Sequence, residues 1–180
     1  MRLDELTLPS DIKSAGRILK AAGWGEDSTG LNSLVYYRDD KNYILKLFKS
    51  RDSAYWAFPE LVLANPNKHF PKIIGKPKKV TDAYYAVRME RLEPIKTPAH
   101  LKIYLEVQSG ERDSEDLFGF MEERYQRAIS YLQENPEMKV ALDLIAEKLL
   151  PIYEEDLHDG NIMERPDGTH VIIDPVIPRF

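Results

Sequence analysis

Residues 156–174 read DLHDGNIMERPDGTHVIID, and this stretch sets the expectations for the rest of the chain. Asp156 and Asn161 stand five positions apart, and Asp174 closes the stretch after two short apolar runs. Between the runs, RPDG at 165–168 combines residue types that favour a tight turn. The pattern predicts two short antiparallel strands, at 161–163 and 170–173, with Asn161 and Asp174 at the same end of the pair.

These three oxygen-bearing side chains indicate a magnesium–nucleotide site. Carboxylate and amide oxygens are hard ligands, and Mg²⁺ takes one or two of them together with substrate phosphates. We therefore predict that Asn161 and Asp174 bind the metal and that Asp156 faces an attacking hydroxyl group. The alternative is an ordinary polar turn, because Asp, Asn and Gly are common turn formers.

The same residues resemble the catalytic and metal-binding loops of the protein-kinase-like superfamily. DLHDGN (156–161) has the form D-x-H-x-x-N, and Ile173-Asp174 has the I-D that replaces D-F-G, as in the aminoglycoside and choline phosphotransferase branch. The resemblance implies that Asp156 is the catalytic base, that Asn161 and Asp174 hold Mg²⁺, and that ATP donates the phosphoryl group. It also implies an α+β, two-lobed fold, with a small antiparallel sheet lobe before a truncated, mainly helical lobe.

The order of the expected elements matches that fold, with one lobe over residues 1–92 and the other over 93–180. Ser10 is the expected cap of the first helix, Gly23 its end, and Asp52 or Ser53 the cap of the second. Ser114 is the expected cap of a helix in the second lobe, and Asn135-Pro136 opens the next. The predicted helices cover residues 11–22, 53–64, 97–107, 114–132 and 136–149. The predicted strands cover residues 34–38, 43–48, 72–80 and 84–92, with a short first strand near Trp24.

Lys46 interrupts the apolar strand YILK (43–46), at a position that resembles the lysine of the kinase V-A-I-K strand. Phosphoryl transfer needs a cation on the nucleotide phosphates, so Lys46 is predicted as a catalytic and ATP-binding residue. The alternative is a lysine on an edge strand that faces water. Glu60, on the following helix, is the candidate to pair with Lys46, although a Glu on a helix surface is the simpler interpretation.

The remaining nucleotide contacts are implied by alignment with the same family. Ser28 and Gly30 correspond to a phosphate-covering loop that keeps only its central glycine, in the spacing S-x-G-x-x-S-x-V. Gly23-x-Gly25-x-x-Ser28 is a rival register, and a flexible loop after the first helix is the alternative interpretation. The carbonyl group of Glu90 and the amide group of Leu92 would bind adenine at the hinge between lobes, and Met163 would line the floor of the pocket.

Composition excludes several other classes of protein. The 180 residues include no cysteine, which rules out disulfides and thiolate metal sites, and the four His are too far apart for a zinc pattern. A net charge of −5 without a long basic run argues against nucleic acid as a partner. The chain has no apolar run that could cross a membrane and no secretory signal, so we expect a soluble cytoplasmic protein.

Two functions are compatible with the sequence. The first is an ATP- and magnesium-dependent phosphotransferase acting on a hydroxyl group of an unidentified protein or small molecule. The alternative is a weakly active or inactive kinase-like interaction or regulatory module. The latter is favoured by Glu154, where the family usually has His, and by a chain that ends six residues after Asp174. In this respect the chain resembles the abbreviated kinase-like proteins of bacteria and phages.

Overall fold

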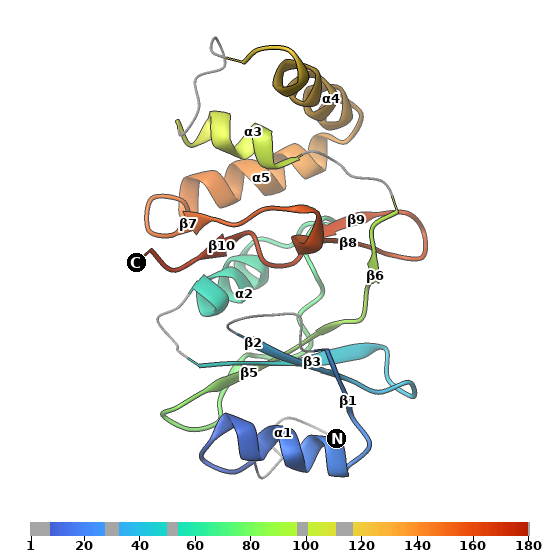
Figure 1. Cartoon of the computed structure of the whole chain (residues 1–180), viewed down its shortest axis with the longest axis vertical. Coiled ribbons are helices and arrows are strands. Elements are labelled where there is room, and N and C mark those ends of the chain that lie inside the picture. Colours follow the sequence, from blue (N-terminus) through green and yellow to red (C-terminus); the bar gives the residue numbers. More distant parts are fainter. Residues whose placement is uncertain (1–7, 28–32, 50–53, 97–100, 111–116, 180) are drawn as a thin grey trace. The chain divides into compact units, whose positions relative to one another are not determined.

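The computed structural model describes residues 8–27, 33–49, 54–96, 101–110 and 117–179. Within these ranges the protein is a mixed α+β structure with five α-helices and small antiparallel sheets (Figure 1). Its contacts divide the chain into two compact units, one of residues 1–59 with 72–91 and one of residues 60–71 with 92–180. Residues 60–71, which the sequence analysis assigned to the first part of the chain, thus group with the second unit.

The first unit is built on a five-stranded antiparallel sheet with the strand order β1-β2-β3-β5-β4. The strands are β1 Gly25–Asp27, β2 Ser33–Tyr37, β3 Tyr43–Phe48, β4 Lys78–Lys79 and β5 Tyr85–Glu90. The short strand expected near Trp24 is confirmed as β1. The long strand predicted at 72–80 is wrong: only β4 and an isolated bridge between Ile73 and Met89 form. Gly75, at φ +78°, and Pro77 interrupt the run, because neither residue fits a continuous ladder.

Helix α1, Ile12–Ala21, covers one face of this sheet (Figure 1). Its Leu19 packs in one buried cluster with Leu45 and Leu47, which alternate along β3. The expected cap at Ser10 is wrong by one residue: the Asp11 carboxylate accepts the Ser14 N–H at 2.7 Å. Gly23 ends the helix as predicted.

Helix α2, Ala54–Ala64, follows β3, and its first turns supply Tyr55 and Trp56 to the opposite face of the sheet. There they pack with Phe48 and neighbouring aromatic and apolar side chains of β5. Pro59 lies inside α2, and the division between the two units falls directly after it. The caps predicted at Asp52 or Ser53 lie outside the described residues.

Three helices contact one another in the second unit: α3 Leu101–Gln108, α4 Phe120–Glu134 and α5 Pro136–Lys148. Pro136 begins α5 as predicted, and Met138, Leu142 and Ile145, which share one face of this helix, are buried. The predicted start of α4 is wrong, because the helix begins at Phe120, after Gly119 at φ +57°. Ser114 and Thr97 lie outside the described residues. No helix in the described ranges is long and apolar enough to cross a membrane.

Short strands complete the second unit (Figure 1). They are β6 Glu93–Pro94, β8 Ile162–Glu164 and β9 His170–Ile172 in one sheet, and β7 Glu154–Glu155 with β10 Val176–Ile177 in another. The predicted β8–β9 hairpin is confirmed, with Gly168 at φ +85° in its turn. The guanidinium group of Arg165 donates to the Phe70 carbonyl group at 3.0 Å, which attaches residues 60–71 to this hairpin.

Candidate functional site

The loop that carries Asp156 and the segment that carries Asp174 are joined by backbone hydrogen bonds. The Asp156 N–H donates to the Pro175 carbonyl group at 2.9 Å, and the Ile173 N–H donates to the Asn161 carbonyl group at 2.9 Å. Asn161 ends the 3₁₀ turn η3, Asp159–Asn161, directly before β8, while Asp174 follows β9. The β8–β9 hairpin therefore places these two residues at the same end of the strand pair.

The side chain of Asn161 is oriented by Asp156. Its amide nitrogen donates to the Asp156 carbonyl oxygen at 2.6 Å and lies 3.3 Å from Oδ2 of the Asp156 carboxylate. An asparagine side chain has donors only on its nitrogen and acceptors only on its oxygen. With the nitrogen directed at Asp156, the oxygen is the atom of this side chain that could bind a cation.

The donor set of this loop fits a magnesium ion that arrives with a nucleotide. Asn161 and Asp174 are both half-buried and supply oxygen ligands of the type that Mg²⁺ prefers. Across the described residues, no three His, Cys, Asp or Glu side chains form a group that could hold a metal ion by themselves. A nucleotide-bound Mg²⁺ does not need such a group, because phosphates and water fill its other positions.

Glu155, the residue before Asp156, has contacts that were not predicted from the sequence. Its side chain is only 3% exposed and forms an ion pair with Lys102 of α3, at 3.3 Å between Oε2 and Nζ. Its other oxygen, Oε1, accepts the Leu157 N–H. Burial raises the pKa of Glu155 above its usual value, although Lys102 acts in the opposite direction. The one available signal was the acidic run before Asp156, which does not reveal burial or partner.

His158 has a local role. It is exposed, and its Nδ1 accepts the Gly160 N–H at 3.0 Å. A Cβ atom at position 160 would lie 2.8 Å from Cε1 of the His158 ring, so only glycine fits there without displacing the ring. The two residues therefore shape the turn between Asp156 and Asn161.

Lys46 is buried in the middle of the first unit's sheet. The residue is 5% exposed, and its Nζ lies 5.0 Å from the centre of the Tyr55 ring. Strand β3 has a neighbour on each side, so the alternative of an edge-strand lysine facing water is wrong. A buried ammonium group needs electrostatic partners, and the aromatic ring of Tyr55 supplies one of them.

The other predicted ATP contacts have different outcomes. Ser28 and Gly30 lie outside the described residues. Glu60 is exposed and belongs to the second unit, so its pairing with Lys46 stays a prediction. Glu90 ends β5 and is held by two hydrogen bonds with Lys72: the Lys72 N–H donates to Oε1 of Glu90 at 2.7 Å, and the Glu90 N–H donates to the Lys72 carbonyl group at 2.9 Å.

Leu92 and Met163, the remaining predicted ATP contacts, both fall in the second unit. Leu92 is its first residue after Arg91, and Met163 lies in the middle of β8. Both are half-buried, and Met163 is paired with Val171 across the hairpin. Their contacts with adenine stay a prediction.

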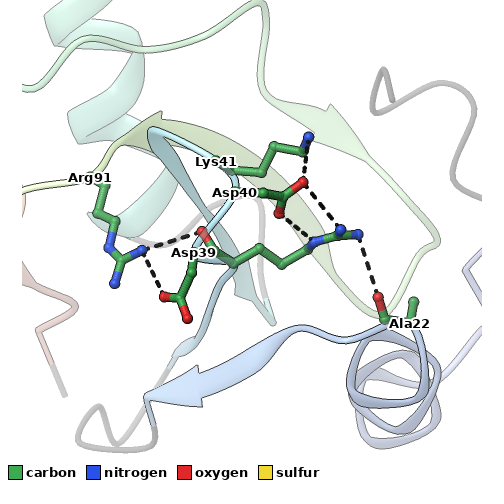
Figure 2. Close-up of polar contacts among 6 residues, drawn as sticks. Ala22, Asp39, Asp40, Lys41 and Arg91 are labelled. Carbon is green, nitrogen blue, oxygen red and sulfur yellow. Dashed lines mark hydrogen bonds and ion pairs between the residues drawn. The ribbon is translucent and has the colours of Figure 1, made fainter.

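Arg91, which precedes Leu92, is fixed to the first unit by several polar contacts (Figure 2). One of its side-chain nitrogens donates to the Arg38 carbonyl group at 3.2 Å and lies 3.4 Å from the Asp39 carboxylate. Arg38 in turn forms two hydrogen bonds with Asp40, at 2.8 and 3.2 Å, and donates to the Ala22 carbonyl group at 3.4 Å. The β2–β3 turn thus holds both the end of α1 and Arg91, which stands between the two predicted adenine contacts, Glu90 and Leu92.

The second unit also contains a polar pocket of about 210 Å³ that includes none of the predicted site residues. Its lining consists of Lys68, His69, Tyr131, Asn135, Asp167, Gly168, Thr169 and His170. The Tyr131 hydroxyl group lies 2.9 Å from Nδ1 of His170, and burial raises the pKa of Tyr131 to about 12. This tyrosine therefore keeps its proton at neutral pH, and its hydroxyl group forms a hydrogen bond with His170.

The comparisons with known proteins assign the chain to no family. A scan against models of protein families finds no match, and a search of curated proteins finds no match either. A function for this chain is therefore argued from the residues and geometry described above.

Proposed function

We propose that the protein is an ATP- and Mg²⁺-dependent phosphotransferase with a kinase-like, two-lobed fold. The observation that carries the proposal is the Asn161 side chain, whose nitrogen binds Asp156 while Asp174 lies at the same end of the β8–β9 hairpin. A carboxylate next to two oxygen ligands is the combination that phosphoryl transfer to a hydroxyl group requires.

In the proposed reaction, the oxygen of an acceptor hydroxyl group attacks the γ-phosphorus of ATP. A new P–O bond forms, the bond between the γ-phosphorus and the β–γ bridging oxygen breaks, and ADP leaves with the electron pair. The Asp156 carboxylate orients the hydroxyl group and accepts its proton. The acceptor belongs to a protein or a small molecule.

The other residues act through charge and position. Mg²⁺, when bound, neutralises charge on the phosphates, and Asn161 and Asp174 would hold it. Lys46 is assigned to the ATP phosphates, whose negative charge is complementary to its buried ammonium group. Little covalent chemistry is asked of the protein, so most of the rate enhancement would come from positioning.

The test is a transfer assay with labelled ATP and Mg²⁺, in which the protein is incubated alone and with a cell lysate. Asp156→Asn removes the proton acceptor with little change in shape, and should lower transfer by about 100-fold or more. Asp167→Asn is the matched control, because Asp167 is exposed in the hairpin turn and should not affect transfer. Lys46→Met should weaken ATP binding.

Three results would decide between the candidate functions. Transfer that depends on Asp156 and not on Asp167 supports the phosphotransferase. Equal transfer by wild type and Asp156→Asn contradicts the assignment of the base. Thermal stabilisation by ATP and Mg²⁺ without any transfer favours the alternative, a kinase-like interaction module.

A further inference from the structure

Glu155 is a buried carboxylate next to the proposed base, and it has two defined partners. One oxygen accepts the Leu157 N–H, so the side chain of Glu155 bridges the backbone on both sides of Asp156. The other oxygen pairs with Lys102, whose side chain is 48% exposed on α3. Leu157 itself is fully buried, which fixes the far end of this bridge.

The backbone around Asp156 is restrained from a second direction. Strand β7 pairs with β10 in a register that places Glu155 opposite Val176. The Asp156 N–H donates to Pro175, and the Asp156 carbonyl oxygen accepts the Asn161 amide. Glu155 therefore adds a side-chain restraint at a point where both backbone groups of Asp156 are already bound.

We propose that Glu155 and Lys102 form a positioning pair that holds the Asp156 loop in the geometry for proton transfer. This inference rests on the proposed function, since it takes Asp156 to be the base. Neither residue is assigned a contact with substrate. The Lys102–Glu155 ion pair attaches the loop to α3. The hydrogen bond from the Leu157 N–H to Glu155 sets the direction in which the Asp156 side chain points.

The energetics of burial favour this interpretation over a purely stabilising role. Removing a carboxylate from water is costly, and apolar residues of similar size often stabilise a protein as much as a buried ion pair does. If position 155 served stability alone, an uncharged side chain of similar size would therefore be sufficient. A charge is useful there because an ionised carboxylate holds a backbone N–H more strongly and more directionally than a neutral group.

Three variants distinguish the two contacts of Glu155, and a fourth serves as the control. Glu155→Gln keeps an oxygen for the Leu157 N–H and loses the ion pair, whereas Glu155→Leu loses both contacts and keeps the volume. Lys102→Met removes the ion pair from the other side. Glu164→Gln is the matched control, because Glu164 is also a buried glutamate paired with an exposed lysine, Lys96, at 3.1 Å.

The first measurement is the steady-state kinetics of phosphoryl transfer. Glu155→Leu should lower kcat by about 10- to 100-fold with little change in the KM for ATP, because a misplaced base slows chemistry without removing a nucleotide contact. Glu155→Gln should lower kcat less than Glu155→Leu does. Glu155→Gln and Lys102→Met should be non-additive when combined, since both remove the same ion pair. Kinetics of Glu155→Leu equal to those of Glu164→Gln would overturn the proposal.

The second measurement does not depend on enzymatic activity, so it also separates this inference from the proposed function. Hydrogen–deuterium exchange of the full chain should show faster exchange of the Leu157 amide in Glu155→Leu, with protection of α5 unchanged. Glu155→Gln should keep most of the protection. If wild type transfers no phosphate and Glu155→Leu still shows this exchange pattern, the proposed function fails and the structural part of the pair stands. Unchanged Leu157 exchange in Glu155→Leu would overturn the pair itself.

Discussion

Asn161 shows how one side chain links local structure with the proposed chemistry. Its nitrogen closes the loop on Asp156, and its oxygen is thereby directed away from that residue. The choice of residue follows from this double requirement, because Asp has no donor and Ser is too short to span the same gap. The five-residue spacing in the sequence places Asp156 and Asn161 in one loop, but it could not predict the hydrogen bond between them.

His69 leads to a prediction about pH at the same scale. Its Nδ1 donates to the His170 carbonyl group at 2.8 Å, while Nε2 is buried without a hydrogen-bond partner among the described residues. Burial lowers the pKa of His69 below 6.5. The unfolded chain then binds a proton at position 69 more readily than the folded chain does. The stabilisation that comes from keeping His69 neutral is therefore complete above pH 6.5, and it decreases as the pH falls toward the lowered pKa.

Urea unfolding at about pH 7.5 and about pH 5.5 checks this prediction. Wild type should lose stability between the two conditions, and His69→Gln should lose less, because glutamine keeps a donor for the His170 carbonyl group and does not titrate. An identical loss in both proteins would show that His69 does not contribute to the pH dependence.

At the scale of elements, the β8–β9 hairpin depends on the backbone of its turn. Gly168 has φ +85°, and a Cβ atom placed there would meet no atom within 4 Å. Gly168→Ala should therefore lower the free energy of unfolding by about 1 kcal/mol through backbone strain alone. Gly168→Asn should cost less, because asparagine adopts positive φ more readily. Equilibrium urea unfolding measures both, and an alanine variant as stable as wild type would contradict this account of the turn.

The elements that could be predicted from sequence are those with strong local signals. RPDG defined the β8–β9 turn, and Asn135-Pro136 defined the start of α5. The predicted elements were wrong where the spacing of apolar residues continued past a glycine or proline that interrupts regular secondary structure. Residues 72–80 read as one strand although Gly75 and Pro77 interrupt it, and the helix predicted at 114–132 extended across Gly119, whereas α4 begins at Phe120.

At the scale of the whole molecule, sequence order predicted the α+β class, but it could not predict burial. Lys46 and Glu155 both stand in short strands, and only tertiary packing shows that each is buried. The partner of Glu155, Lys102, is distant in the sequence and lies on a different element, so no local pattern connects them. Buried charges are the features for which neighbours in space matter most.

The same limit applies to the proposed nucleotide site as a whole. The sequence brought Asp156, Asn161 and Asp174 into one stretch, and the backbone hydrogen bonds of the second unit join the segments that carry them. Lys46 and Glu90 belong to the first unit. The proposed function therefore requires that the binding of one ligand, ATP with Mg²⁺, depends on both sets of residues.

Calorimetric titration of ATP, with and without Mg²⁺, is the measurement that tests the proposed site most directly. Wild type should bind ATP at least about tenfold more tightly with Mg²⁺ than without it, because Asn161 and Asp174 would hold the ion that accompanies the phosphates. Asp174→Asn should lose most of that dependence, and Asp167→Asn, which changes an exposed carboxylate in the hairpin turn, should keep it. Equal affinities in the presence and absence of Mg²⁺ for wild type, or an Asp174→Asn variant that behaves as wild type does, would contradict the magnesium–nucleotide site.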